Sequence, residues 1–415
     1  MKLTHVRQVA VFYAPVPERR RKVGRLALEH RQILFEYDPA FLGSKLELSP
    51  FHLRITPDVV VGQPALFEGL MGVFDDSLPD GWGRLLIDRR AAELGLARAA
   101  LTPLDRLTVV GARSMGALVY EPEAPLDDPT IVKLAELADD ASTVLQDAGG
   151  ADLERLIAIG GSPQGARPKV LIQLAPSGAV HFGAREIQPG FTAWLVKFPA
   201  RDDDRHSAAL EHAYFLMAAD AGIDVPRTQL LGATRRQPGY FAIERFDRRA
   251  ATRIHTHTLG GLLHLPHGYP ALDYRDLLDV TRRLTRNEAD VVEVFRRACF
   301  NVLAHNRDDH CRNHAFVMHD DGTWRPSPAY DLTFAPGPGG EHTMLVAGEG
   351  RAPGREHLVT LAQQAELKRA TVIIEEVRAA VARFRDFADQ AGVPARLRER
   401  VASALGLAKA PPRRR

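Results

Sequence analysis

Three polar residues in the last third of the chain constrain its fold more than any other feature. Asp308 and Asn313 are separated by four residues, and Asp331 lies 18 residues beyond Asn313. This spacing lets one carboxylate meet a substrate hydroxyl while an amide and a second carboxylate hold a metal ion against phosphate oxygens. A tight loop followed by a short hairpin would bring the three side chains together.

Protein kinases place an Asp and an Asn at this separation in the catalytic loop, with a metal-binding Asp on the next strand. On this pattern Asp308 is the candidate general base, and Asn313 and Asp331 are the candidate magnesium ligands. The alternative is a transition-metal site built from Asp308, Asp309, His310 and Asp331. Magnesium prefers few carboxylates together with substrate phosphates, which favours the first interpretation. Asp309 and His310 are interpreted as supporting residues.

A glycine-rich segment, Gly160–Lys169, lies between a predicted helix and a predicted strand. Its three glycines permit unusual backbone angles and a close approach of amides to phosphate oxygens. The segment is not a Walker sequence, because the spacing differs and no Lys-Ser/Thr pair closes it. A plain surface loop is the alternative.

Lys197 interrupts the otherwise apolar predicted strand Trp194–Phe198. A lysine is rarely buried in such a strand unless it is paired, so Lys197 is a candidate phosphate ligand, with Glu211 on the following helix as its partner. A lysine on a solvated strand face is the alternative. The segment Glu244–Arg248 directly follows the predicted strand Tyr240–Ile243, where a kinase presents backbone groups to adenine; an ordinary charged turn is the alternative.

The overall pattern predicts an α+β protein of two kinase-like lobes preceded by a small β-rich domain. A length of 415 residues allows two or three domains. We expect the β-rich domain at residues 1–125, a lobe with the phosphate loop at 126–250, and a helical lobe with the catalytic loop at 251–415. Within these, a hairpin is predicted from Gly24–Leu28 and Ile33–Tyr37, and a helix over Pro103–Val110.

Composition excludes several functional classes. The net charge of +2 gives no global attraction to nucleic acid or membranes, and two cysteines do not form a disulfide framework. We expect a cytoplasmic protein, because the N-terminus lacks the apolar core of a signal peptide and no apolar run is long enough for a membrane span. The histidines of the stretch 255–267 match no closed zinc site, so we expect solvated or hydrogen-bonded histidines there.

The order of these motifs resembles the HipA family of bacterial serine/threonine kinases, the toxins of type II toxin–antitoxin pairs. The motifs that carry the resemblance are Leu78–Gly83, Gly165–Lys169, Lys197–Pro199, Glu244–Arg248, Asp308–Asn313 and Pro328–Asp331. No single motif is unique to the family, but their order and spacing together are specific, and the likeness spans nearly the whole chain.

The resemblance implies a complete set of roles. ATP and Mg²⁺ would be the cofactors, with Asp308 as the base and Asn313 and Asp331 on the metal. The nucleotide-binding residues would be Gln164, Gly165, Ala166, Arg167, Lys169, Lys197, the backbone of Glu244, Arg245 and Phe246, and His310, Asn313 and Asp331. The substrate would be a protein such as an aminoacyl-tRNA synthetase. The partners would be a small HipB-like helix-turn-helix antitoxin and, through it, operator DNA, with no membrane.

Ser162 falls where the family carries its autophosphorylated serine. A phosphoserine adds about −1.5 to −2 charges, which would repel ATP phosphates from the same loop. Arg167 or Arg312 would then capture the phosphate outside the loop, and Pro163 removes one amide donor beside it. Two other functions stay open: a co-repressor that acts mainly by binding the antitoxin, and a small-molecule or lipid kinase that shares the fold.

Overall fold

The computed structural model describes residues 3–97, 100–126, 133–160, 163–183, 186–234, 238–265 and 272–408. The chain divides into two compact units. The first consists of Met1–Asp203, Ala242–His267 and Ala315–Trp324, and the second of Asp204–Phe241, Gly268–His314 and Arg325–Arg415. The predicted division into three domains is finer than this one and stays a prediction.

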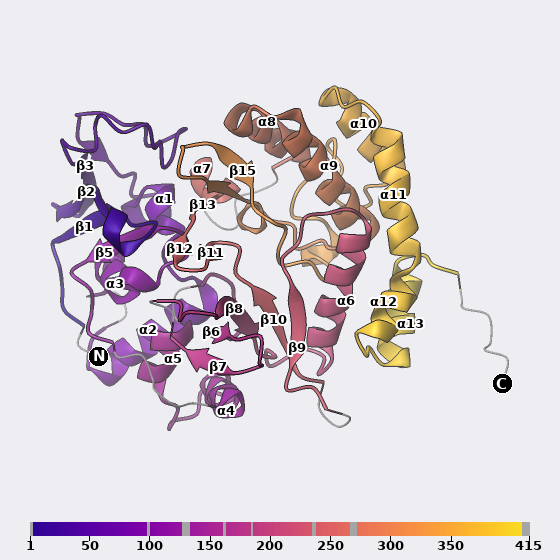
Figure 1. Cartoon of the computed structure of the whole chain (residues 1–415), viewed down its shortest axis with the longest axis horizontal. Helices are drawn as coiled ribbons and strands as arrows, with labels where there is room; N and C mark the ends of the chain where they lie inside the picture. Colours follow the sequence, from indigo (N-terminus) through magenta and orange to yellow (C-terminus); the bar gives the residue numbers. More distant parts are fainter. Residues whose placement is uncertain are drawn as a thin grey trace. The chain divides into compact units, whose positions relative to one another are not determined.

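The first unit begins with a five-stranded antiparallel sheet of order β4-β3-β2-β1-β5 (Figure 1). Its strands are β1 (Gln8–Tyr13), β2 (Arg21–Glu29), β3 (Gln32–Tyr37), β4 (Val60–Val61) and β5 (Leu118–Glu121). Every second residue of β1 and β3 is buried, which is the alternation of a sheet with one face on a core. The predicted hairpin is confirmed. Its turn residues, His30 and Arg31, both have positive φ, as a tight two-residue hairpin requires.

Short helices follow the sheet in the sequence. They are α1 (Gly72–Asp75), α2 (Gly81–Glu93) and α3 (Pro103–Val110). The predicted helix over Pro103–Val110 is confirmed as α3. It begins at Pro103 because Thr102 and Asp105 form a capping box and proline suits the first helical position. Helix α3 packs on β1 and β5 and is buried along its whole length.

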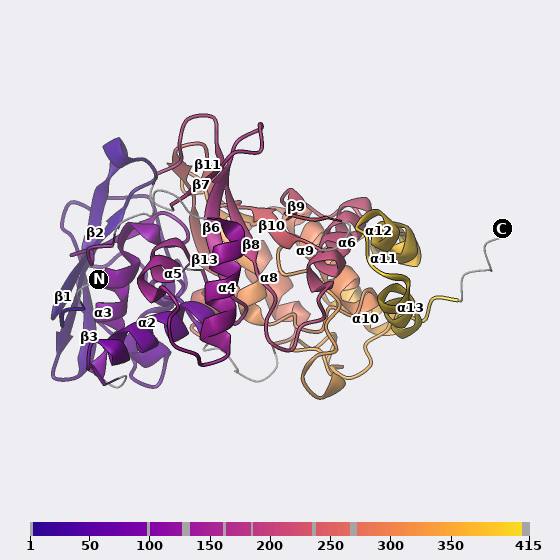
Figure 2. The same ribbon diagram turned by 90° about the horizontal axis from the view of Figure 1, so that it is seen from below.

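The second sheet of the first unit carries the glycine-rich segment at one end. Helices α4 (Leu134–Leu145) and α5 (Leu153–Gly160) precede it, and α5 packs on both α2 and the first strand of the sheet (Figure 2). The neighbouring strands are β7 (Val180–Phe182), β6 (Lys169–Leu174), β8 (Thr192–Lys197) and β10 (Tyr240–Glu244). All six residues of β6 are buried, so this strand forms the centre of the local core.

The remainder of the first unit contains the histidine-rich stretch. Its elements are β11 (Arg248–Arg249), β12 (Thr252–Arg253), β13 (His255–Thr258), α7 (Leu259–Leu262), β14 (Ala315–Met318) and the start of β15 (Trp324–Pro326). Strand β13, which was not predicted, pairs with β14 in antiparallel register.

The described histidines of this stretch are hydrogen-bonded, as expected. His257 lies between the carboxylate of Asp76, 2.5 Å from Nδ1, and the hydroxyl of Ser49, 3.0 Å from Nε2. His255 donates to the Leu48 carbonyl, and His264 accepts from the Gly72 amide. His267 lies outside the described residues.

The second unit is mainly helical. Its elements are α6 (Ser207–Asp220), β9 (Thr228–Leu231), α8 (Tyr274–Thr285), α9 (Glu288–Leu303), α10 (Arg355–Gln364), α11 (Ala370–Ala382), α12 (Phe384–Gln390) and α13 (Ala395–Ala404). Helix α9 packs against α8 and α11, and α6 packs against α12 (Figure 1). No helix in the described ranges is both long enough and apolar enough to cross a membrane.

Candidate active site

The catalytic-loop motif lies directly after α9 in the second unit. Its first aspartate points outward, since the Asp308 side chain is 64% exposed; its Oδ1 lies 3.9 Å from Nε2 of His310. Residues Cys311–Asn313 form a single 3₁₀ turn. The Asn313 side-chain amide donates to the Asp308 carbonyl over 2.6 Å, which closes the loop. Because the amide nitrogen is used in this way, Oδ1 is the Asn313 atom suited to a metal ion.

Asp309, the residue between the candidate base and His310, fixes the loop to the protein interior. Its side chain is fully buried and accepts four hydrogen bonds. The donors are the Tyr274 hydroxyl at 2.8 Å, His342 Nδ1 at 2.9 Å, and the backbone amides of Thr343 at 2.9 Å and Met344 at 3.3 Å. The two adjacent aspartates therefore have opposite orientations, and burying Asp309 holds the Asp308 backbone in a fixed place.

The same buried network reaches the third residue of the motif. Asn301 donates to the Tyr274 hydroxyl, and Asn306 donates to Asn301 at 2.9 Å and to the Asp331 carbonyl at 3.4 Å. Asp331 has a φ of 52°, a left-handed conformation that is uncommon outside glycine and tends to mark functional positions. The fold thus links the Asp308–Asn313 loop and Asp331 through shared hydrogen-bond partners within one unit.

Burial keeps neighbouring groups of this loop uncharged. It lowers the pKa of His314 to about 4 and raises the pKa of Tyr274 well above its ordinary value. Tyr274 consequently acts as a hydroxyl donor to Asp309 at every physiological pH. In the described ranges, no group of three or more His, Cys, Asp or Glu side chains is placed to hold a metal ion by itself.

The phosphate-loop candidates lie together in the first unit, at the start of β6. Lys169 is 4% exposed, and its ammonium donates to the Gln164 carbonyl across the loop. Gly165 has a φ of 108°, a backbone conformation that glycine adopts readily and that residues with a side chain rarely adopt. Arg167 donates to Asp203 over 3.1 Å, and Ala166 is exposed. Ser162 lies outside the described residues.

Lys197 lies opposite Lys169 in the sheet. The two residues are register partners at the ends of β6 and β8, so their side chains leave the same face of the antiparallel pair. Like charges in directly opposed positions destabilise a sheet. Glu211, the predicted partner of Lys197, is buried on α6 of the second unit, and that pairing stays a prediction.

The adenine-binding candidates follow β10. The Arg245 amide donates to the Ala193 carbonyl of β8 over 2.8 Å, so this N–H is used within the sheet. Glu244 is the last residue of β10, and Phe246 lies in the turn that follows it. Sequence reasoning did not distinguish these three positions.

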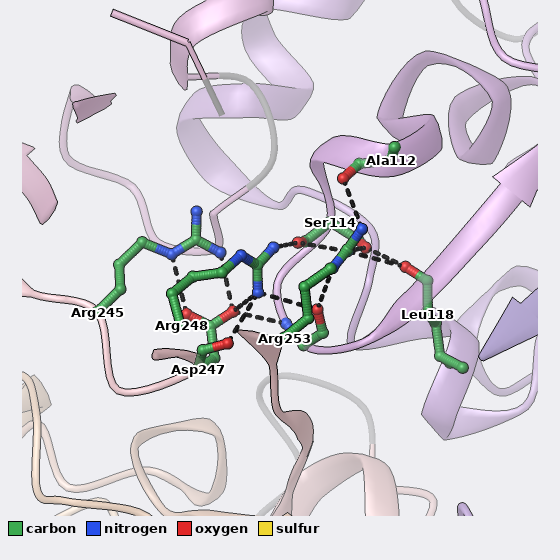
Figure 3. A network of polar contacts seen from close by, with 8 residues as sticks. Ala112, Ser114, Leu118, Arg245, Asp247, Arg248 and Arg253 are labelled. Atoms are coloured by element: carbon green, nitrogen blue, oxygen red, sulfur yellow. Dashed lines mark hydrogen bonds and ion pairs between the residues drawn. The ribbon is translucent and has the colours of Figure 1, made fainter. Parts of the chain in front are cut away.

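The side chains of this segment form a buried cluster of arginines around one carboxylate (Figure 3). Asp247 accepts two hydrogen bonds from Arg245, at 2.9 and 2.8 Å, and one from Arg248 at 2.7 Å. Burial by itself would raise the pKa of Asp247, but the charges of Arg245 and Arg248 hold that pKa well below its usual range. The aspartate is therefore ionised at neutral pH.

The arginines of this cluster also hold the loop that precedes β5. Arg248 donates to the carbonyls of Ser114 and Gly116, and Arg253 donates to those of Ala112, Gly116 and Leu118 (Figure 3). The Gly116 amide in turn donates to Asp247 at 2.7 Å. The segment after β10 is thereby fixed to a loop more than 100 residues earlier in the chain, and no local sequence signal could have revealed this contact.

Comparisons with known proteins agree with this architecture. The family model of the HipA N-terminal domain matches residues 16–121, and that of the HipA-like C-terminal domain matches residues 161–384. A candidate kinase of Sinorhizobium fredii is 27% identical over 262 residues, which are 60% of this chain and 56% of that protein. A candidate kinase of Haemophilus influenzae is 26% identical over 147 residues, 32% of this chain and 43% of that protein. The chain thus spans about half the length of these curated relatives.

One solved structure has the same fold over nearly the whole chain. It is HipA of the Shewanella oneidensis MR-1 toxin–antitoxin system, solved with HipB and operator DNA, with a TM-score of 0.68, 17% identity, and coverage of 96% of this chain and 95% of that one. The predicted α+β fold is confirmed by this match. Since the C-terminal domain model alone covers more than half of the sequence, the chain belongs to the HipA family.

Proposed function

We propose that this chain is an ATP- and Mg²⁺-dependent protein serine/threonine kinase that acts as the toxin of a toxin–antitoxin pair. The observation that carries the proposal is the pair Lys169 and Lys197, opposed across β6 and β8 beneath a glycine-rich loop. A polyphosphate that contacted both side chains would form charge-assisted hydrogen bonds with two lysines at once. A strand pair with two lysines at one end is therefore suited to the phosphates of ATP.

The second unit would supply the groups for the transfer itself. Asp308 would accept the proton of a substrate hydroxyl, and its exposure suits a group that must meet another protein. Oδ1 of Asn313 and the carboxylate of Asp331 would hold magnesium, which neutralises charge on the phosphates. Glu211 would orient Lys197. Adenine would be held by backbone groups from Glu244 to Phe246, while the Arg245 side chain serves the buried cluster.

The proposed partners come from the family and from the matched structure. The HipA of Shewanella oneidensis was solved with HipB and operator DNA. We propose a HipB-like antitoxin for this chain, contact with operator DNA through that antitoxin, an aminoacyl-tRNA synthetase as substrate, and autophosphorylation at Ser162. The same complex supports a second candidate function, in which the chain acts mainly as a co-repressor. Operator binding by the antitoxin alone and with this chain, measured by gel shift, tests that role.

Transfer of radiolabelled phosphate tests the proposed activity. Purified protein is incubated with labelled ATP, magnesium and a cell lysate, and the labelled proteins are identified by mass spectrometry. Wild type should label itself and one protein, whereas Asp308→Asn should lose at least about 100-fold in rate, the scale of a general-base contribution. Asp386→Asn, an exposed acid on α12, is the matched control and should keep full activity. Full activity of Asp308→Asn would contradict the assigned base.

A further inference from the structure

The turn before α2 makes a set of direct contacts with the glycine-rich loop. Gln164 Nε2 donates to the carbonyls of Asp75 at 3.3 Å and Leu78 at 3.2 Å. The Gly165 amide donates to Asp80 Oδ1, and the Gly165 carbonyl accepts from the Trp82 amide at 3.1 Å. Two successive residues of the loop are thereby held by a segment more than 80 positions earlier in the chain.

Asp80 is the N-cap residue of α2, but its side chain does not cap that helix. It precedes the first residue of α2, where an aspartate commonly accepts a hydrogen bond from the first turn of its own helix. Here its side chain makes no such bond, and its carboxylate accepts from the amide of Gly165 instead. The Gly165 carbonyl in return satisfies Trp82, one of the first-turn amides that a helix leaves without an internal partner. Loop and helix thus cap each other.

Steric fit at Gly81 enforces the same arrangement. A Cβ built on Gly81 would lie 2.6 Å from Ala166 Cα and 2.9 Å from Ala166 N, both backbone atoms that cannot turn aside. The position of the turn also affects the buried Lys169. Its ammonium donates to the carbonyl of Gln164, the same residue whose side chain donates to the turn. A shift of the turn would therefore move both the loop amides and the lysine.

We propose that Asp80 and Gly81 are positioning residues for the phosphates of the nucleotide: they set the shape of the Gln164–Ala166 loop without contacting the ligand. The proposal rests on the kinase function proposed above. It assigns to the turn Asp75–Trp82 a part in nucleotide binding that its place in the N-terminal family domain does not suggest. It also separates the phosphates from adenine, because Arg245, in the middle of the adenine-binding candidates, contacts β8 and Asp247 of the arginine cluster.

Binding of ATP, ADP and adenosine to the full chain, measured by calorimetry, tests the proposal. Asp80→Ala and Gly81→Ala should each weaken ATP and ADP binding by about tenfold, the scale of one charge-assisted hydrogen bond, and leave adenosine binding within about twofold. Asp80→Asn retains a carbonyl acceptor for the Gly165 amide and should weaken ATP binding less than about threefold. If ATP and adenosine affinities fall in parallel, or if neither falls, the proposal is overturned.

Thr102→Ala is the matched control, because Thr102 caps α3 of the same unit through the Asp105 amide, and its hydrogen bonds in the described part of the chain are to Asp105 and Arg106. It should lower stability while leaving the ratio of ATP to adenosine affinity unchanged. Should wild type bind neither ligand, the kinase proposal fails, and hydrogen exchange of a peptide covering residues 163–169 then decides the positioning role. Amide exchange in this peptide should be faster in Asp80→Ala than in wild type or Thr102→Ala. Equal exchange rates would refute the positioning role.

Discussion

Replacing Asp309 by Asn removes a single charge from the centre of the catalytic-loop anchor. In wild type, Oδ1 accepts from the Thr343 and Met344 amides, and Oδ2 accepts from the Tyr274 hydroxyl and His342 Nδ1. The side-chain carbonyl oxygen of an asparagine can still accept hydrogen bonds from the Thr343 and Met344 amides. Its NH₂ group then takes the place of Oδ2 and faces two donors.

The cost follows from these contacts. A hydrogen bond to a charged group contributes about 1.5–3 kcal/mol, and two are lost on the Oδ2 side. His342 can relieve one clash by moving its proton to Nε2, whereas the Tyr274 hydroxyl, which already accepts from Asn301, loses the acceptor for its own proton. We therefore expect Asp309→Asn to lower the free energy of unfolding by about 2–4 kcal/mol. Tyr274→Phe removes one donor and should cost about 1–2 kcal/mol.

Urea unfolding followed by fluorescence measures both variants against wild type. The midpoint should fall in the order wild type, Tyr274→Phe, Asp309→Asn, and phosphate transfer by the folded Asp309→Asn protein should be slower because Asp308 loses its support. Asp386→Asn, which removes an exposed charge of α12, should stay within about 0.5 kcal/mol of wild type. An Asp309→Asn midpoint equal to that of wild type, or a larger loss in Tyr274→Phe, would refute the reasoning.

Other substitutions and conditions have equally defined outcomes. Asp247→Asn leaves two buried arginines, Arg245 and Arg248, with one charge fewer to balance them and should cost about 3–5 kcal/mol by urea unfolding; an unchanged midpoint would mean that the arginines relax. Burial lowers the pKa of His255 to about 4 in the folded state, against about 6.5 unfolded, so the unfolded chain binds more protons between these values. Stability should therefore fall as pH falls from about 6.5 to 4, and a thermal melting series should be flatter in His255→Gln. Lys197→Met should raise the KM for ATP at least about tenfold, while circular dichroism stays that of wild type; an unchanged KM would remove Lys197 from the phosphate site.

Local patterns in the sequence predicted most of the elements but few of the long-range contacts. The alternation in β1 and β3 and the capping signals of α3 identified these elements because their cause is local. Strand β13 was missed, since its alternation of histidine and threonine carries no apolar signal although His255 and His257 are buried. The family motifs located the candidate bases, lysines and metal ligands by spacing.

The supporting residues of the site could be identified only from the structure. Asp308 and Asp309 are chemically identical neighbours, and only the fold decides which one is buried. The partners of Asp309 come from positions 274 and 342–344, and the partner of the Gly165 amide comes from position 80. Such pairs are set by tertiary packing, and neither hydrophobic period nor motif spacing encodes them.

The arginine cluster around Asp247 limits which segments of this protein can be exchanged with those of a relative. Arg248 and Arg253 donate to backbone carbonyls between Ala112 and Leu118, which belong to the segment matched by the N-terminal family model. Every residue has a main-chain carbonyl, so these contacts depend on the path of the loop rather than on its side chains. A chimera that joins the N-terminal segment of one family member to the remainder of another would therefore misplace charged groups in a dry interior. Exchange between relatives should succeed only when both stretches, 112–118 and 245–253, are transplanted as one unit.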